Sequence, residues 1–393
     1  MASKNISKLF NIAQKPERII IGLMSGTSLD GLDIALCRFK GNGFNTSFQL
    51  LDYTTIPYPS NFKQDVRLVF AQQQVSLQKL CLLNASIGTL HARYILEALH
   101  QWKYKAGEVD LIASHGQTIY HAPKRLHRQE NYPNATLQIG DGDHIAVKTG
   151  ILTISDFRQK HVAAGGEGAP LALYGDVLLG SHSQENRILL NIGGIANLTW
   201  LPTNKQGIIC TDVGPGNTLI DAACRKYFDK PYDEGGQIAF SGQAHGALLH
   251  QLLQHPFFTE AAPKTTGPEL FSSNYVQEAQ QQANALNITP EDLIATLSAF
   301  TAEAIIAFIK SNISSSINKL LASGGGAKNK YITNYLQQAF PAVQIANTGE
   351  IGINADAKEA ILFALLANEA IAGEPIAIGN NPAVLMGKFS FPA

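Results

Sequence analysis

Cysteine is scarce in this chain, which limits the metal and disulfide chemistry it can carry. Its 393 residues include four cysteines, and no two of them form a C-x-x-C pair. Neither a structural zinc site nor a disulfide framework is therefore expected. Free thiols of this kind usually pack as small hydrophobic side chains. These cysteines are Cys37, Cys81, Cys210 and Cys224.

The chain also lacks a strong charge of either sign and a long apolar run. Its formal net charge is −1, which argues against binding to nucleic acid or to an anionic membrane surface. No stretch of roughly 18 apolar residues is present, so no membrane span is expected. The apolar run Ile19–Met24 is too short and too late for a signal peptide. We expect a cytoplasmic protein.

Two common phosphate-binding signatures are missing as well. The sequence contains no G-x-x-x-x-G-K-[ST], and no G-x-G-x-x-G lies between a strand and a helix. Any phosphate must therefore be bound by another glycine-containing turn.

The order of apolar runs and glycine turns predicts mixed α/β domains. Residues 19–24 and 32–39 are expected to be strands on either side of the turn at 25–31. The pattern starts again at Ile188–Leu190, which is followed by Asn191-Ile192-Gly193-Gly194 and a further apolar run. A length of 393 residues suits two domains, and the repeated hairpin suggests an internal duplication.

Other elements follow from apolar periodicity and from helix start and stop signals. Thr289 and Pro290 read as the cap and first residue of a helix that runs to about Lys310. Residues 1–17 are expected to form a loose polar arm. The remaining expectations are helices at 76–102 and from Asp356 to before Gly373, and strands at 110–114, ending in His115-Gly116-Gln117-Thr118, at 151–154 and at 320–323.

The two glycine hairpins can bring backbone N–H groups close to an anion, because glycine has no Cβ. Each hairpin alone is also compatible with a plain tight turn. Together with Ser323-Gly324-Gly325-Gly326, their order resembles the phosphate, phosphate and adenosine motifs of the actin and hexokinase superfamily. That superfamily usually opens its hairpins with an Asp that holds Mg²⁺ through water. Here Met24 or Ser25 and Asn191 stand near those places, which leaves Asp30, Asp33 and Asp212 as metal candidates.

Longer strings resemble the anhydro-N-acetylmuramic acid kinase family from about Ile20 to Gly387. Pro268 stands where that family commonly has Arg. The matching strings are Gly22-Leu23-Met24-Ser25-Gly26-Thr27-Ser28-Leu29-Asp30-Gly31-Leu32-Asp33, Ser114-His115-Gly116-Gln117-Thr118, Gln138-Ile139-Gly140-Asp141-Gly142, Asp156-Phe157-Arg158, Asn191-Ile192-Gly193-Gly194-Ile195-Ala196-Asn197 and Asp212-Val213-Gly214-Pro215-Gly216-Asn217.

This resemblance implies two actin-like, ribonuclease H-like α/β lobes with a nucleotide cleft between them. Expected boundaries are an arm at 1–18, a first lobe at 19–180 and a second lobe at 181–393, with the final helix near the hinge. The implied reaction is ATP-dependent phosphorylation of O6 of 1,6-anhydro-N-acetylmuramic acid with opening of the anhydro ring by water. The products would be N-acetylmuramic acid 6-phosphate and ADP, with Mg²⁺ accompanying ATP; a homodimer is left open.

The resemblance also assigns residues. Asp156 is implied as the base that activates water, although an Asp after a strand is often a turn or cap residue. The implied sugar-binding residues are His115, Asp141, Arg158 and Glu359. The implied ATP-binding residues are Gly26, Thr27, Ser28, Leu29, Asp30, Gly31, Leu32, Asp33, Gly193, Gly194, Gly324, Gly325 and Gly326.

Each sugar-site residue has a structural alternative. Arg158 could bind phosphoryl groups or the lactyl carboxylate, or form a surface salt bridge. His115 could be a core residue, and Asp141 and Asp143 could cap a helix. Glu359 could close a capping box with Asp356.

Beyond this site, the start of the helix after Asp212-Val213-Gly214-Pro215-Gly216-Asn217 offers free N–H groups for an anion. Two other functions remain open at this stage. One is another sugar or acetate-type kinase of the same fold, and the other is a non-catalytic actin-like nucleotide switch.

Overall fold

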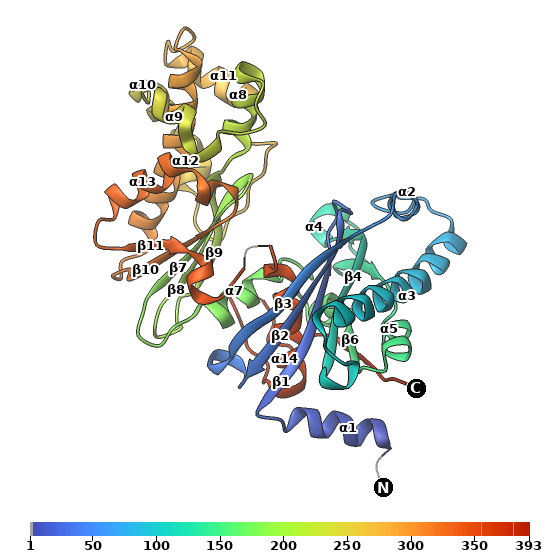
Figure 1. Cartoon of the computed structure of the whole chain (residues 1–393). Helices are drawn as coiled ribbons and strands as arrows, with labels where there is room; N and C mark the ends of the chain where they lie inside the picture. The colour runs from blue at the N-terminus through green and yellow to red at the C-terminus, as the bar shows by residue number, and fades with distance from the viewer. Residues whose placement is uncertain (1–2, 355, 380) are drawn as a thin grey trace. The chain divides into compact units, whose positions relative to one another are not determined.

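The computed structural model describes residues 3–354, 356–379 and 381–393, and these group into two compact units. The first unit comprises Met1–Leu179 and Gly352–Ala393, and the second comprises Gly180–Ile351. The predicted second lobe, 181–393, thus differs from the observed grouping, because the C-terminal segment returns to the first unit. Figure 1 shows this return as the red helix α14 (Lys358–Ala372) lying against the blue strands.

A mixed sheet forms the first unit. Strands β1, β2 and β3 are antiparallel, β4 and β6 run parallel to β1, and β12 pairs antiparallel with β6. The order is β12-β6-β4-β1-β2-β3, with β5 paired to β4. The strands are β1 (Glu17–Ser25), β2 (Gly31–Lys40), β3 (Ser47–Pro57), β4 (Leu111–Ala122), β5 (Ala135–Ile139), β6 (Thr153–Ser155) and β12 (Lys388–Ser390).

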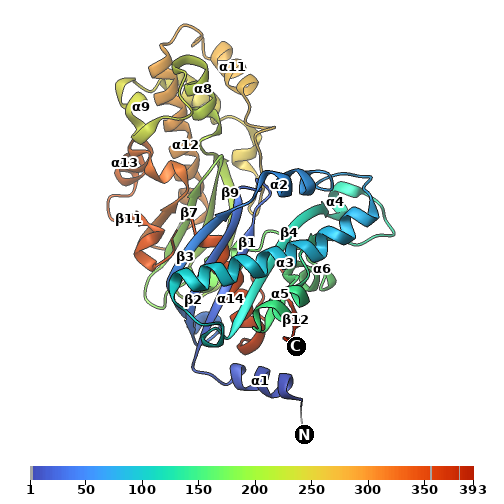
Figure 2. The same ribbon diagram turned by 45° about the vertical axis from the view of Figure 1, so that its right-hand side comes forward.

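Alternation along β1 assigns the two faces of this sheet. Ile21 and Leu23 belong to a buried cluster with Ile95 of α3 (Leu77–Trp102), and successive side chains of a strand point to opposite faces. Gly22 therefore faces the other side, where a Cβ on it would lie 1.9 Å from the carbonyl oxygen of Ala360 in α14. Glycine at this position lets α14 pack directly on the strand. Figure 2 shows α3 and α14 on opposite faces.

Buried polar groups hold α14 in place. Arg18 is 2% exposed and donates from Nε to Asn368 Oδ1 at 2.8 Å. Glu369 accepts from the N–H of Gly43 at 2.8 Å and from the hydroxyl of Thr46 at 3.0 Å. Because these buried groups are satisfied only when α14 is docked, the contacts specify its position.

The second unit repeats the same strand arrangement. Strands β7, β8 and β9 are antiparallel, and β10 and β11 run parallel to β7. Its order, β11-β10-β7-β8-β9, matches β6-β4-β1-β2-β3 of the first unit. The mixed α/β class and the internal duplication are therefore confirmed. The strands are β7 (Arg187–Ile192), β8 (Ile195–Leu201), β9 (Ile209–Pro215), β10 (Lys319–Ser323) and β11 (Gln344–Asn347).

Helices of the second unit gather around α12 (Pro290–Asn312), as Figure 1 shows. Thr289 caps this helix by accepting from the N–H of Asp292 at 3.1 Å, and Pro290 is its first residue, as predicted. Among the described residues, α12 alone is long and apolar enough to cross a membrane, but 83% of its apolar window is buried in the protein. The other helices are α8 (Thr218–Phe228), α9 (Gln237–Ser241), α10 (Gly246–Leu252), α11 (Ser273–Gln282) and α13 (Lys330–Ala339).

Two expectations about the first unit were wrong, and one alternative is not realised. The predicted loose arm contains α1 (Lys4–Ala13), whose cap Ser3 accepts from the N–H of Ile6. His115 to Thr118 do not follow β4 but continue it, since the strand extends to Ala122. Helix α14 begins at Lys358 and its cap is Ala357, so the capping box of Glu359 does not form. The unit's remaining helices are α2 (Ser60–Arg67), α4 (Lys124–His127), α5 (Gly142–Thr149), α6 (Phe157–Ala163) and α7 (Ala172–Gly180).

Candidate active site

A cavity of about 540 Å³ opens in the first unit beside the ends of β6 and β12. Its lining combines residues from three of the predicted motifs with residues that the sequence did not single out. The motif residues are His115, Asp141 and Asp156, and the others include Asn84, Ser155 and Lys388. Strand pairing of β4 with β6, and of β6 with β12, brings these distant segments together.

Asp156 lies between β6 and α6 with left-handed backbone angles, φ 53° and ψ 49°. Its side chain makes no capping hydrogen bond to α6, so the cap alternative is not realised. Instead, its Oδ2 lies 2.5 Å from the Nζ of Lys388. The Asp156 side chain is 25% exposed, and it lines the cavity. A carboxylate in this position can accept a proton from a bound water.

His115 is held as a neutral imidazole on β4. Its Nδ1 pairs with the carbonyl oxygen of Gly116, and its Nε2 accepts from Nε of Arg158, both at 2.9 Å. The ring packs against Phe363 of α14, with ring centroids 4.6 Å apart. Burial, reinforced by the positive charge of Arg158, lowers the pKa of His115 to about 3. The imidazole is therefore uncharged at neutral pH.

Arg158 is anchored by its hydrogen bonds rather than by a surface salt bridge. Besides His115, it donates from Nη1 to the carbonyl oxygen of Gly168 at 2.6 Å. Burial lowers the pKa of Arg158, and the negative charge of Glu359 opposes that shift. The guanidinium thus ties α6 to β4 and to the glycine-rich segment that follows α6.

Asp141 both caps a helix and lines the cavity. One carboxylate oxygen accepts from the N–H of Asp143 at 2.8 Å, at the start of α5. Asn84 of α3 fixes the preceding turn, because its side chain accepts from the N–H of Gly140 at 2.9 Å and its carbonyl accepts from Asp141 at 3.1 Å. The two alternatives for Asp141 are therefore compatible.

Glu359 is not among the residues that line this cavity. It is exposed in the first turn of α14. Partial desolvation, with repulsion from Asp33, raises the pKa of Glu359, and Arg158 acts in the opposite sense. Asp33 itself accepts from the hydroxyl groups of Tyr53 at 2.9 Å and Thr55 at 2.5 Å.

The first glycine hairpin joins β1 to β2 as predicted. Thr27 and Ser28 are exposed at its tip, whereas Leu29 is 2% exposed and has φ 61°. In the described part of the chain, the N–H groups of Thr27 and Ser28 donate to no backbone carbonyl. A buried leucine in the left-handed region is strained, and its buried side chain anchors the loop beside the exposed Thr27 and Ser28.

A buried chain of hydrogen bonds supports this hairpin from below. The hydroxyl of Tyr58 contacts His91 Nε2 at 2.9 Å and donates to Ser25 at 2.8 Å. Ser25 donates to Gln117 Oε1 at 2.5 Å, and Gln117 donates to the carbonyl oxygen of Gly26 at 3.4 Å. The string His115-Gly116-Gln117 thus contributes to two sites. His115 lines the cavity, and Gln117 forms hydrogen bonds with residues of the hairpin.

In the second unit, the two predicted glycine turns meet. A Cβ on Gly324 would lie 2.6 Å from the carbonyl oxygen of Ile192, and one on Gly326 would lie 2.2 Å from Ile192 Cγ2. Asn217 also contacts this junction, since its Nδ2 donates to the same carbonyl oxygen of Ile192 at 3.2 Å. Only glycine permits this approach between the end of β10 and the β7–β8 turn.

The start of α8 braces this hairpin instead of offering free donors. The N–H of Asn217 donates to Gly193 at 2.7 Å, and those of Gly216 and Thr218 donate to Gly194 at 2.9 and 3.3 Å. The predicted anion site at these N–H groups is therefore not present.

Carboxylates suited to a metal are dispersed. Among the described residues, no group of three His, Cys, Asp or Glu side chains converges on a possible ion. Asp212 accepts from the N–H of Thr266 at 2.9 Å, and burial raises the pKa of Asp212. Within the described residues, a divalent ion would therefore find no preformed cluster of three such ligands.

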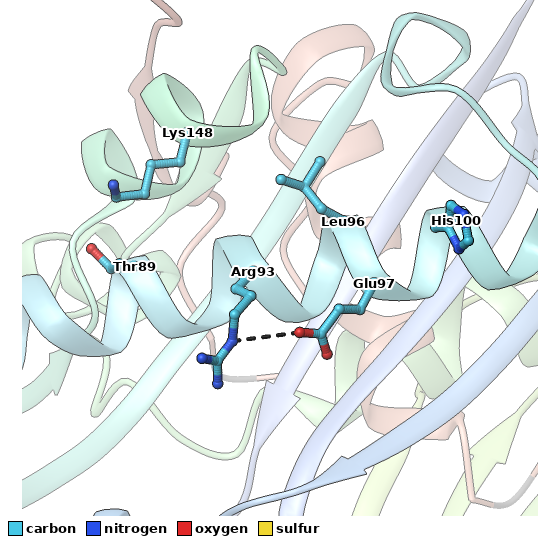
Figure 3. A pocket seen from close by; sticks show the side chains of 6 residues that line it. All are labelled: Thr89, Arg93, Leu96, Glu97, His100 and Lys148. Carbon is cyan, nitrogen blue, oxygen red and sulfur yellow. Dashed lines mark ion pairs between the residues drawn. The ribbon is translucent and has the colours of Figure 1, made fainter.

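A second, larger hollow of about 740 Å³ lies along α3 and contains none of the predicted residues. Figure 3 shows Lys148 facing this helix and an ion pair between Arg93 and Glu97, with N and O 3.5 Å apart. Among the described residues, no buried polar side chain lines this larger hollow. The residues that line it are Thr89, Arg93, Leu96, Glu97, His100 and Lys148. We therefore place the candidate chemistry in the cavity with Asp156.

Three positions of the site were missed from sequence. Lys388 lies far from Asp156 in the chain, and only the pairing of β12 with β6 brings them together. Asn84 is one polar residue within an amphipathic helix, without a local signal. Gln117 stands inside a matched string, yet its supporting role depends on the register of β1 with β4.

The comparisons with known proteins agree with one another. The family model described as "Anhydro-N-acetylmuramic acid kinase" matches residues 18–387. The chain is 48% identical to the anhydro-N-acetylmuramic acid kinase of Pseudoalteromonas atlantica over 99% of this chain and 100% of that protein. It is 38% identical to the protein of the same name from Caldanaerobacter subterraneus subsp. tengcongensis, over 98% and 100%.

Solved structures resemble the chain distantly. The activator of the 2-hydroxyisocaproyl-CoA dehydratase from Clostridium difficile aligns with a TM-score of 0.41 and 12% identity, covering 90% of this chain and 95% of that one. That likeness is too distant to inform the fold or the site.

Proposed function

The chain belongs to the anhydro-N-acetylmuramic acid kinase family, and we propose that Asp156 is the base of its reaction. The enzyme uses ATP to phosphorylate O6 of 1,6-anhydro-N-acetylmuramic acid while water opens the anhydro bridge. N-acetylmuramic acid 6-phosphate and ADP are formed. This activity places the chain in amino-sugar metabolism, in the recycling of peptidoglycan.

The reaction requires one well-placed carboxylate. Water attacks C1 of the sugar and gives a proton to the base, while the bond from C1 to O6 breaks. O6 takes the γ-phosphoryl group of ATP, and ADP leaves. An inverting glycosidase needs a second carboxylic acid to protonate its leaving oxygen. Here no such acid is needed, because the leaving oxygen O6 gains the phosphoryl group instead of a proton.

One observation carries the assignment of Asp156. Its carboxylate caps no helix and lines a cavity of about 540 Å³ together with His115 and Asp141. The three residues come from separate segments of the chain, so their meeting follows from the fold. The left-handed backbone at Asp156, with φ 53°, further suits a functional position that is held under strain.

We assign the neighbouring groups to sugar binding. Neutral His115, kept in one tautomer by Arg158 and Gly116, presents a fixed ring to the cavity. Asp141 offers its carboxylate to sugar hydroxyl groups. Glu359 lies outside the cavity lining, and its proposed sugar contact requires the substrate to extend toward α14.

We assign the glycine turns to ATP. Residues 26–33 of the first unit and Gly193–Gly194 of the second would bind phosphates through backbone N–H groups. Adenosine would lie at Gly324, Gly325 and Gly326. Thr27 and Ser28 are exposed, and their N–H groups donate to no backbone carbonyl in the described residues, which supports this role.

Mg²⁺ is compatible with the chain as an ion bound together with the phosphates of ATP, rather than by protein side chains alone. It prefers phosphate oxygens, water and one or two carboxylates, and Asp30, Asp33 and Asp212 are the carboxylates that we propose for it. When bound, it would neutralise charge on the β- and γ-phosphates. We also propose a cytoplasmic location, with neither nucleic acid nor membrane as a partner.

Steady-state kinetics of Asp156→Asn test the assignment. A general base contributes about 10²- to 10⁴-fold, so turnover in a coupled ADP assay should fall by that factor with an unchanged melting temperature. Asp65→Asn is the matched control, because Asp65 also pairs with a lysine, Lys79, at 2.5 Å. Wild-type turnover by Asp156→Asn would refute the role.

A further inference from the structure

The cavity with Asp156 is lined by three carboxylates and one cation. The carboxylates are those of Asp141, Asp143 and Asp156, and Lys388 is the one lysine or arginine among the described lining residues. The sugar of the proposed reaction carries a carboxylate of its own, on the lactyl ether. Like charges repel strongly where water is partly excluded, so this substrate needs a cation in the cavity.

Backbone geometry holds the main chain of Lys388 in place. Lys388 is paired with Ser155 in the β12–β6 ladder. The preceding Gly387 has φ 105°, and a Cβ there would lie 2.4 Å from Ile154 Cγ2. β12 therefore packs closely against β6, and the backbone of Lys388 has a fixed position at the cavity.

The ammonium group, by contrast, is exposed to solvent. The side chain of Lys388 is 64% exposed, and its 2.5 Å contact with Asp156 is an exposed ion pair. Such pairs contribute about 0–1 kcal/mol, and lysine is a flexible point charge. Exchanging one carboxylate partner for another therefore costs little free energy.

Arg158 is less suited than Lys388 to binding the lactyl carboxylate, although it also carries a positive charge. Its Nε and Nη1 already donate to His115 Nε2 and to the carbonyl oxygen of Gly168. Arg158 is half-buried, and this burial lowers its pKa. Binding the lactyl group would require it to leave contacts that fix the site.

We propose that Lys388 binds the lactyl carboxylate of the sugar and thereby releases Asp156 to accept a proton from water. This inference rests on the proposed function. No covalent bond changes in the exchange: the ammonium leaves one carboxylate and pairs with another. Lys388 thus favours an unpaired Asp156 when a carboxylated sugar is bound, and it selects muramic acid derivatives over sugars that lack the lactyl group.

Calorimetric binding of two sugars to the full chain tests this selection. The probes are 1,6-anhydro-N-acetylmuramic acid and 1,6-anhydro-N-acetylglucosamine, which has a hydroxyl in place of the lactyl ether. Lys388→Met should weaken binding of the first sugar by about fivefold, the value of a single exposed ion pair, and leave the second unchanged. Lys388→Arg should restore most of the loss, because it keeps the charge.

Lys79→Met is the matched control, since Lys79 forms an ion pair of the same length with Asp65. Equal weakening of both sugars by Lys388→Met, or no weakening of either, would overturn the inference. So would failure of Lys388→Arg to recover binding. A wild-type chain that neither binds nor phosphorylates the carboxylated sugar would instead overturn the proposed function.

Discussion

Arg158 donates a hydrogen bond from Nε to Nε2 of His115 at 2.9 Å. A nitrogen that accepts from a guanidinium carries no proton, so the proton of His115 resides on Nδ1, which faces the carbonyl oxygen of Gly116 at 2.9 Å. The pair therefore fixes both the tautomer and the orientation of the imidazole. The fixed orientation of the imidazole depends on the packing of α6, β4 and the segment around Gly168.

Arg158→Lys should damage this arrangement although it preserves the charge. A lysine lacks the planar fork that contacts His115 and Gly168 together, and a buried acceptor without its donor loses about 1–3 kcal/mol. We expect kcat/KM to fall about tenfold or more, with ¹⁵N NMR showing a mixture of His115 tautomers. Arg125→Lys is the control, because Arg125 is an exposed arginine that pairs with Glu167 at 3.3 Å; equal effects of both variants would contradict the account.

Stability should decrease in acid because two buried histidines stay neutral in the folded chain. Burial lowers the pKa of both His91 and His115 to about 3, whereas an unfolded histidine has a pKa of about 6.5. Between these values the unfolded state binds protons that the folded state excludes. Stability is thus fully present above pH 6.5 and falls as the pH drops toward 3, by on the order of 1 kcal/mol per pH unit for each group.

His91→Gln isolates one of the two contributions. Glutamine can keep a hydrogen bond to Tyr58 but cannot take up a proton in this range. The free energy of unfolding, measured with urea from pH 7 to pH 4, should depend on pH less steeply in the variant by about one proton. An unchanged slope would mean that His91 is not excluded from protonation.

Gly22→Ala should destabilise the first unit through α14. The added Cβ would lie 1.9 Å from the carbonyl oxygen of Ala360, and backbone atoms cannot yield as side chains do. We expect a loss of about 2 kcal/mol or more, in the range of overpacked cores, seen as a lower melting temperature. Gly107→Ala is the control, because nothing lies within 4 Å of its Cβ position; a wild-type melting temperature for Gly22→Ala would contradict the packing.

Local signals explain most of what was predicted from sequence. The cap at Thr289, the β1–β2 hairpin and the β7–β8 hairpin each depend on a few adjacent residues, and each forms as expected. The repeated hairpin also indicated the duplication that the matching strand orders establish. Patterns within one short segment were sufficient for these features.

Features set by distant segments could not be predicted in the same way. The strand expected at 110–114 was predicted to end before His115 and Gln117, but β1 and β5 pair with their strand on both sides. The polar composition of residues 1–17 predicts a loose arm, whereas residues 4–13 form the amphipathic α1. The contact of Lys388 with Asp156 requires β12 to return to β6, and nothing local to either residue indicates that pairing.

The central claim, that Asp156 directs water onto the anomeric carbon, is tested most directly with ¹⁸O-labelled water. Wild-type chain supplied with MgATP and 1,6-anhydro-N-acetylmuramic acid should place one ¹⁸O atom on C1 of the 6-phosphate product, detected by mass spectrometry. Asp156→Asn should lose ¹⁸O incorporation and ADP release together, by about 10²-fold or more. Unlabelled product from the wild type, or undiminished labelling by the variant, would contradict the account.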